Sequence, residues 1–267
     1  MKTVVITGAA RGFGFAMAEC FKKVNFNIVI CDVNSEELKN AQEKLENIKG
    51  KGTVTSIKAD VTNEDDIKEV ILKAQETFQN IDIWINNAGV NQPNKPIWEL
   101  TKKEIDRLID IDLKGTVICS RLIMEVMIKQ GYGAIYNVEG HGSNDAKILG
   151  LSLYGTSKRA VTYFTEALAY EAEKLNTNII VGKITPGIMI TNFITTSLGD
   201  GEKIELDEKT KKVYNILGDY PETIARFMVE KIITNKKNGA KLAWLTNRRA
   251  AWRFMTSGFN KRNFFDK

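Results

Sequence analysis

Short apolar runs alternate with amphipathic segments along the whole chain, and this alternation constrains the fold more than any other feature of the sequence. Strands that alternate with helices indicate a parallel sheet covered by helices on both faces. We therefore predict a doubly wound α/β fold around a seven-stranded parallel sheet. The predicted strands are 4–6, 27–31, 53–59, 81–85, 134–138, 178–184 and 241–245.

Apolar residues at helical spacing predict helices between these strands. Asn63 and Thr101 are suitable N-cap residues, and the region after Thr101 is expected to form two helices that meet near Asp112. Residues 188–220 show no clear period, which favours a mobile loop or short helices. The predicted helices follow the glycine segment 8–14 and then span 34–48, 63–78, 101–129, 152–174 and 222–234.

The composition indicates one large globular domain, because 43% of the 267 residues are hydrophobic and 27% are charged. The N-terminal apolar run is too short for a signal peptide, and no segment reaches the roughly 18 apolar residues of a membrane span. A cytoplasmic location is therefore expected. Three scattered cysteines and a single histidine, His141, argue against a disulfide framework and a metal site.

The net charge of +5 is concentrated at the C-terminal end. Residues 247–267 contain six basic residues and one acid, so the rest of the chain is neutral. This distribution argues against nucleic-acid binding and indicates one basic, aromatic tail. The tail is expected to pack on the domain or a neighbouring subunit. Contact with an anionic membrane surface, or partial disorder, is the alternative.

Glycines and polar residues gather where the predicted strands end, and ligands of such sheets bind beyond the carboxyl ends of the strands. Glycines at 8, 12 and 14 follow the first strand. They either make a tight turn or let backbone N–H groups approach a pyrophosphate, and their place before a helix favours the second interpretation. The residues at strand ends are Gly8, Asp32, Asp60, Asn86, the segment 139–143 and Pro186.

Asp32, at the end of the second strand, is placed to bind both ribose hydroxyls of adenosine. A carboxylate there would repel a 2′-phosphate, so NAD is favoured over NADP. Arg11 favours NADP, because a guanidinium can bind that phosphate. The acid is the stronger signal, since it faces the discriminating group from a rigid strand end.

Tyr154 and Lys158 lie four residues apart in a predicted helix and so share one face. A nearby lysine cation lowers the pKa of a phenol, which then can give or take a proton. A solvated helix pair is the plain alternative for this spacing, so the interpretation depends on the motifs that precede it.

Together these residues resemble the short-chain dehydrogenase/reductase family. The resemblance covers about residues 1–190 and implies a Rossmann-type fold and hydride transfer with a nicotinamide cofactor, Tyr154 being the acid/base and Lys158 holding the ribose. It also implies that Ile188 and Thr191 bind the carboxamide. The implied cofactor residues are Gly8, Arg11, Gly12, Phe13, Gly14, Asp32, Asp60, Val61, Asn86, Asn87, Ala88, Gly89, Tyr154, Lys158, Pro186, Gly187, Ile188 and Thr191.

The chain departs from this family at two positions. Asp112 stands where the family usually has an asparagine that anchors a water in the proton relay, so the relay is expected to be rewired or shifted in pH dependence. The usual catalytic serine is missing from its slot, which holds Gly140 by one count and His141 by another. Ser143 is the nearest hydroxyl and the first candidate for the carbonyl contact, with His141 second or merely a loop histidine.

The segment 139–143 and the tail resemble the chlorophyll b reductase-like branch of the family. This suggests a carbonyl on a large, rigid ring system, such as a hydroxysteroid or bile acid. A sugar or acyl ketone is the alternative substrate, and an NAD(H)-binding sensor or scaffold without catalysis is the alternative function. The family also implies one domain over 1–246, a substrate lid at 188–220 and a dimer or tetramer, with 247–267 as the tail.

Overall fold

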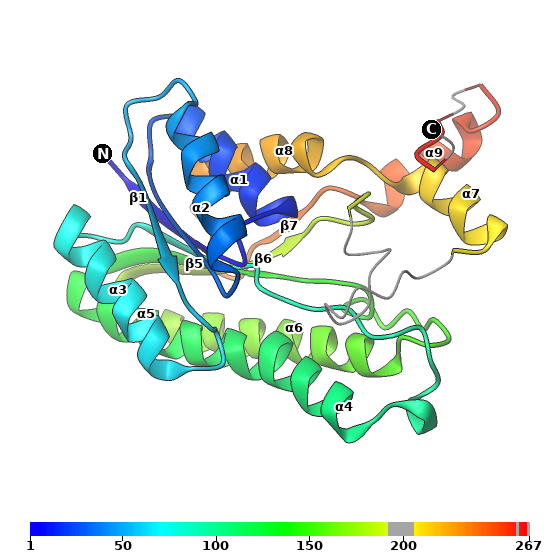
Figure 1. Cartoon of the computed structure of the whole chain (residues 1–267), viewed down its shortest axis with the longest axis horizontal. Coiled ribbons are helices and arrows are strands. Elements are labelled where there is room, and N and C mark those ends of the chain that lie inside the picture. The colour runs from blue at the N-terminus through cyan, green and yellow to red at the C-terminus, as the bar shows by residue number, and fades with distance from the viewer. Residues whose placement is uncertain (192–205, 260–261, 266–267) are drawn as a thin grey trace.

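The computed structural model confirms the predicted fold, a seven-stranded, all-parallel sheet with helices on both faces (Figure 1). The structure describes residues 1–191, 206–259 and 262–265. The strands run in the order β3-β2-β1-β4-β5-β6-β7. They are β1 Thr3–Thr7, β2 Asn27–Asp32, β3 Val54–Lys58, β4 Ile83–Asn86, β5 Tyr132–Val138, β6 Asn178–Thr185 and β7 Lys241–Ala243.

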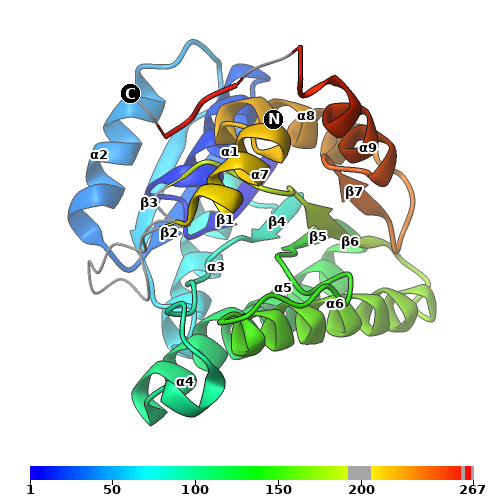
Figure 2. The same cartoon turned by 90° about the vertical axis from the view of Figure 1, so that its right-hand side faces the viewer.

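The helices form two layers, one on each face of the sheet (Figure 2). Helices α1 (Gly12–Lys23), α2 (Ser35–Glu46) and α8 (Pro221–Thr234) pack on one face, and α3 (Glu64–Phe78), α5 (Thr116–Gln130) and α6 (Ser152–Glu173) on the other. Each layer buries its own apolar cluster against the strands, which explains why the strand runs are apolar on both faces.

The order of the strands reverses between β1 and β4. These two strands are neighbours in the sheet, but they are not consecutive in the sequence. Helices α1 and α5, which come after β1 and β4, therefore lie on opposite faces of the sheet, and ligands of such sheets bind at the strand ends where the order reverses. Val5 of β1 pairs with Val29 of β2 and with Trp84 of β4, so the carboxyl ends of the three strands lie side by side.

Local sequence signals explain the helix starts that were predicted. Thr101 and Glu104 form a reciprocal capping box at α4 (Lys102–Leu108), and Asn63 accepts a hydrogen bond from the Asp65 N–H at α3. The predicted pair of helices near Asp112 consists of α4 and α5, joined by a π-helical turn, η2 (Ile109–Gly115), which contains Asp112. A short 3₁₀ helix, η1 (Ile97–Glu99), precedes α4.

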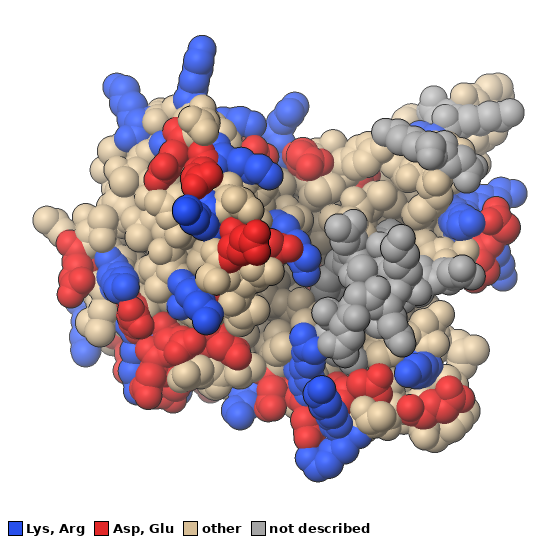
Figure 3. Space-filling model, in the orientation of Figure 1, with Lys and Arg blue, Asp and Glu red and all other residues tan. Residues whose placement is uncertain are grey.

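The C-terminal region holds one short helix within the predicted segment 188–220 and one helix in the tail that was not predicted. Helix α7 (Glu208–Leu217) lies in the lid region, and α9 (Asn247–Thr256) lies in the tail and packs against α7 (Figure 1). Much of the predicted substrate lid, residues 192–205, lies outside the described residues. In the described ranges, no helix is long and apolar enough to cross a membrane. On the face in Figure 3, basic and acidic side chains are intermixed.

Candidate active site

The glycine segment after β1 forms a cradle whose shape only glycine permits. Gly8 has φ +60°, and a Cβ there would lie 2.6 Å from the Cα of Ala88. A Cβ at Gly14 would lie 2.5 Å from the side-chain amide nitrogen of Asn87. Gly12 also has φ +60°, but a Cβ there would meet no described atom within 4 Å. Gly8 and Gly14 are therefore closely packed, whereas there is open space beside Gly12.

This open space faces the N-terminus of α1. The N-cap residue Arg11 makes no side-chain cap among the described residues, so the first backbone N–H groups of α1 remain available to an anion. Phe13 is buried in the core, so it can offer only its backbone here. The cradle therefore fits the pyrophosphate of a dinucleotide.

Thr7 and Asn87 hold the cradle in place. The Thr7 hydroxyl accepts hydrogen bonds of 3.0 Å from the backbone N–H groups of Asn87 and Ala88. The Asn87 side chain donates to the carbonyl oxygens of Thr7 and Gly8, at 3.0 and 2.9 Å. These bonds join the end of β1 to the segment after β4.

Asp32 lies at the end of β2 beside the cradle, as predicted from its position. Its carboxylate accepts hydrogen bonds of 3.2 Å from the N–H groups of Ala10 and Asn34 and is half-buried. Arg11 is exposed and pairs with Glu37 of α2, at 3.2 Å. Two carboxylates therefore lie near this end of the cradle, and one of them is paired with the only guanidinium of the glycine segment.

The other predicted adenosine residues lie in the turns after β3 and β4. Asp60 accepts hydrogen bonds of 2.8 Å from the N–H and hydroxyl of Thr62, and Val61 is buried against Gly115. The side chain of Asn86, which was expected to line the ribose side of the cleft, bonds to other protein groups. Its amide is buried and donates to Ser120 and Asn137 at 2.9 and 2.8 Å, because β4 turns it into the core.

Tyr154 and Lys158 share one face of α6, and both are buried. The Lys158 ammonium lies 5.5 Å from the centroid of the Tyr154 ring and 2.9 Å from Asp112 Oδ2. The other oxygen of Asp112 accepts a 2.8 Å hydrogen bond from the Val90 N–H. A Cβ at Gly89 would lie 3.3 Å from both Asp112 Oδ1 and the Lys158 ammonium. The structure thus brings together three of the predicted catalytic residues.

The charges of this group oppose one another. The pKa of Tyr154 is raised to about 12: burial is the main cause, Lys158 lowers the pKa, and Asp112 raises it. Burial disfavours the Lys158 cation, but attraction to Asp112 and Tyr154 outweighs this and raises the pKa of Lys158. Lys158 therefore acts on the phenol as expected, yet burial is the larger effect and Asp112 offsets part of the lysine charge.

Gln92 positions Tyr154 and was not predicted. Its buried side-chain oxygen accepts hydrogen bonds from the backbone N–H groups of Leu153 and Tyr154, at 2.9 and 3.0 Å. These groups belong to the first turn of α6, which has no side-chain N-cap among the described residues. A glutamine in a loop carries no local capping pattern, so only the fold reveals this role.

Gly140 lies directly against the side chain of Tyr154. A Cβ at this position would come within 2.3 Å of the Tyr154 hydroxyl and 2.9 Å of Lys158 Cγ. The slot assigned to serine by counting along β5 is therefore too narrow for any side chain while Tyr154 keeps this position.

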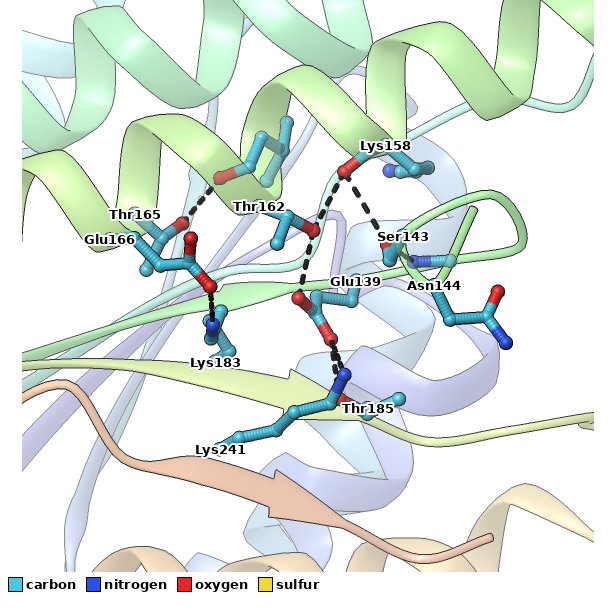
Figure 4. Close-up of polar contacts among 12 residues, drawn as sticks. Glu139, Ser143, Asn144, Lys158, Thr162, Thr165, Glu166, Lys183, Thr185 and Lys241 are labelled. Carbon is cyan, nitrogen blue, oxygen red and sulfur yellow. Dashed lines mark hydrogen bonds and ion pairs between the residues drawn. The ribbon is translucent and has the colours of Figure 1, made fainter. Parts of the chain in front are cut away.

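Ser143 and His141, the two candidates for the carbonyl contact, differ in their surroundings. Ser143 is buried; its hydroxyl donates to the Lys158 carbonyl at 3.4 Å and accepts from the Gly140 N–H at 3.3 Å (Figure 4). His141 is half-buried, and burial lowers its pKa, which favours neutral imidazole. Its Nε2 has no hydrogen-bond partner among the described residues.

Glu139 is buried between β5, β6 and α6 and does not contact Tyr154 in the described hydrogen bonds. Its carboxylate accepts hydrogen bonds from Thr162 at 2.8 Å and Thr185 at 2.6 Å, and pairs with Lys241 at 3.2 Å (Figure 4). The single hydrogen of the Thr162 hydroxyl is shared between Glu139 and the Lys158 carbonyl oxygen, which lies 3.0 Å from that hydroxyl. This network fixes the end of β5, and with it Gly140, relative to α6.

The predicted carboxamide segment follows β6, which ends at Thr185 because Pro186 has no N–H to extend the ladder. Gly187 has φ +76° and would place a Cβ 2.6 Å from Leu245. Ile188 and Thr191 are half-buried, and Met189 pairs with Asp219 in an isolated parallel bridge. In the described ranges, no cluster of three or more potential metal ligands occurs.

Comparison with known proteins agrees with this geometry. The family model described as short chain dehydrogenase matches residues 2–201. Two relatives from Arabidopsis thaliana are the probable chlorophyll(ide) b reductase NYC1, 29% identical over 99% of this chain and 55% of its own length, and the chlorophyll(ide) b reductase NOL, 30% identical over 86% and 64%. Both are named as chloroplastic, and the chain spans about half to two thirds of their length.

Among solved structures, the 3-ketoacyl-(acyl-carrier-protein) reductase from Brucella melitensis, complexed with NADH, has the same fold. Its TM-score is 0.79 at 22% sequence identity, and the likeness covers 93% of this chain and 98% of that one.

Proposed function

Because the chain belongs to the short-chain dehydrogenase/reductase family, in its chlorophyll(ide) b reductase-like branch, we propose that it interconverts a secondary alcohol and a ketone on a large apolar ring, using NAD(H). The oxidoreductase class and a nicotinamide cofactor follow from the family. The observation that carries the proposal is the buried pair of Tyr154 and Lys158, which meets the segment after β4 at Gly89.

A bound nicotinamide supplies a two-electron acceptor or donor of hydride. In alcohol oxidation, the Tyr154 phenolate takes the hydroxyl proton as the C–H electron pair leaves with the hydride, so that the C=O bond forms. In the reverse direction the Tyr154 phenol gives this proton to the carbonyl oxygen. Lys158 stabilises the phenolate, and Asp112 holds Lys158 in place while it limits that stabilisation.

His141 is the better supported donor to the substrate carbonyl. The Ser143 hydroxyl is already bonded to the backbone of α6 and of Gly140, whereas the Nε2 atom of His141 lacks a partner among the described residues. A neutral imidazole can donate one hydrogen bond. His141→Ala should therefore lower kcat more than Ser143→Ala, because the Ser143 hydroxyl is already bonded to the protein.

Asp32 and Glu37 support NAD as the cofactor in preference to NADP. Asp32 already accepts backbone hydrogen bonds at the end of β2, and Arg11 is paired with Glu37. A 2′-phosphate placed here would meet two carboxylates and only one guanidinium, whose charge Glu37 offsets. The ratio of kcat/KM with NAD to that with NADP tests this preference.

Exposed apolar side chains on two segments that contact each other, one leading into η1 and one before α6, support a large apolar substrate. Leu149, 83% exposed, precedes α6, and Trp98, 80% exposed, lies in η1. Their loops touch, since a Cβ at Gly150 would lie 2.1 Å from the Asn94 side chain. The relatives named for chlorophyll(ide) b favour a ring substrate without favouring a steroid. Hydroxysteroids and bile acids are thus tested beside chlorophyllide, sugars and acyl ketones.

Assembly into a dimer or tetramer is part of the proposal, because members of the family are typically oligomeric. Light scattering during gel filtration measures the mass directly. A mass equal to that of one chain would contradict the proposed dimer or tetramer.

The test of the function follows nicotinamide absorbance with each substrate, using wild type and Tyr154→Phe. Tyr163→Phe is the matched control, since Tyr163 is an exposed tyrosine on the same helix. Turnover that Tyr154→Phe abolishes and Tyr163→Phe retains is the expected result. Turnover that survives in Tyr154→Phe would refute the assigned acid/base.

A second function, that of an NAD(H) sensor without catalysis, is favoured by one observation. Burial and the charge of Asp112 keep the pKa of Tyr154 high, although Lys158 lowers it. NADH binding without turnover on any carbonyl of the panel would support the sensor and exclude the enzyme.

A further inference from the structure

Asp219 lies between the C-terminal tail and the segment that follows β6. Its backbone pairs with that segment: the Ile190 N–H donates to the Asp219 carbonyl at 3.0 Å, and the Asp219 N–H donates to the Ile188 carbonyl at 3.1 Å. The same residue is buried, although it carries a charge. A buried carboxylate requires partners, and the tail supplies them.

The side chain of Asp219 is held by three groups. The Trp244 indole N–H donates to Oδ2 at 2.7 Å, Arg253 pairs with the same oxygen at 2.7 Å, and Arg262 pairs with Oδ1 at 3.1 Å. Trp244 follows β7, Arg253 lies on α9, and Arg262 lies beyond it. The Asp219 carboxylate thus contacts the segment after β7, helix α9 and the residues beyond α9.

The two arginines also hold the end of α7. Arg253 donates to the Leu217 carbonyl at 2.8 Å, and Arg262 donates to the Gly218 carbonyl at 2.9 Å and to the Ile216 carbonyl. Carbonyl groups at the C-terminus of a helix lack intrahelical donors, so cations stabilise them. The tail therefore fixes both α7 and the residues just after it.

From these contacts we propose that Asp219, Arg253 and Arg262 form a clasp through which the C-terminal tail positions the residues 188–190 for the nicotinamide. The inference rests on the proposed function in one respect only, the use of a nicotinamide cofactor near Ile188. The clasp residues do not touch the reacting atoms, so they are positioning residues. Without the two arginines, Asp219 is held less firmly. Its backbone then orders Ile188 and Ile190 less well, and this weakens cofactor binding.

Ion pairs in this clasp are shielded more than those on the surface. The side chains of Asp219 and Arg253 are 12% and 14% exposed, so removal of one partner leaves the other poorly solvated. Coupling between such an element and a binding site is typically about 5- to 150-fold in affinity. We expect Arg253→Gln to raise the Kd for NADH about tenfold.

The test measures NADH binding by fluorescence, together with amide hydrogen exchange, in the full-length protein. Arg253→Gln and Arg262→Gln are compared with Arg248→Gln, which removes an exposed arginine from the same helix. The expected result is weaker NADH binding and faster exchange at the Ile190 amide in the first two variants only. Arg253→Lys, which keeps the charge, should recover most of the affinity.

Two results would overturn the clasp. Affinity equal to that of Arg248→Gln would show that the tail does not act on the cofactor site. Exchange that accelerates equally at Ile190 and at Val5 in β1 would show general destabilisation instead of a local effect. NADH binding can be measured without a substrate. The test of the clasp can therefore be interpreted even if no compound of the activity panel is turned over.

Discussion

Replacement of Asp112 by asparagine changes the charge beside Lys158 and keeps the shape of the site. The side-chain oxygen of asparagine can still accept the hydrogen bond that the Val90 N–H makes to Oδ1, at 2.8 Å. The carboxylate charge, 2.9 Å from the Lys158 ammonium, is lost. Tyr154 then has the full effect of the lysine cation, and its pKa must fall.

The size of this effect follows from the distances. Asp112 Oδ2 lies at most about 8.4 Å from the Tyr154 ring centroid, which is 2.9 Å and 5.5 Å taken together. Two unit charges at about 8.4 Å repel by about 2 kcal/mol at an effective dielectric constant of about 20. Since 1.36 kcal/mol corresponds to roughly one pKa unit, the pKa of Tyr154 should fall by about 1 to 1.5 units from about 12.

The assay is kcat/KM as a function of pH in both directions. Reduction needs the protonated phenol, so its alkaline limb should move to lower pH by about one unit. Oxidation needs the phenolate, so its rate at a fixed pH below the pKa should rise about tenfold. Asp110→Asn is the control, because Asp110 is an exposed acid of the same π-helical turn, 3.5 Å from Lys114. An unmoved profile in a folded Asp112→Asn variant, or a shift to higher pH, would refute the reasoning.

Three further predictions concern single residues. Gly140→Ala should displace Tyr154 and lower kcat/KM by about 100-fold, whereas Gly258→Ala, where a Cβ meets no described atom within 4 Å, should leave it unchanged; equal activities would contradict the close contact. Gln92→Ala leaves two N–H groups of α6 unpaired and should lower the free energy of unfolding by about 1 to 3 kcal/mol in urea titration; an unaltered midpoint would exclude the cap. Asp32→Ser should raise the NADP/NAD ratio of kcat/KM about tenfold, and a constant ratio would show that Asp32 does not select the cofactor.

The fold could be predicted because its signals are local and repeated. Parallel strands covered on both faces read as continuous apolar runs, and caps such as Asn63 and Thr101 mark helix starts. The helix α9 was not predicted, because its order depends on Arg253 and Arg262 meeting Asp219 far along the chain. The π-helical turn at 109–115 was likewise not predicted, since apolar spacing does not distinguish it from an α-helix.

The candidate site was predicted where motifs have fixed spacing, and only there. Tyr154 and Lys158 share one face of α6, as their spacing predicts, but the orientation of a single side chain is set by its neighbours in space. Asn86 turns into the core, and Glu139 turns toward Lys241, although both stand at strand ends. The role of Gln92 depends on a contact 61 residues away, which no local pattern shows.

The most direct measurement of the central claim is the fate of the transferred hydrogen. NADH that carries deuterium at the transferred position is incubated with the enzyme and the most active ring ketone of the panel. The mass of the alcohol product is then measured by mass spectrometry. The account predicts one deuterium on the carbinol carbon with wild type and no product with Tyr154→Phe. A product without deuterium, or one formed equally by Tyr154→Phe, would contradict hydride transfer with Tyr154 as the acid/base.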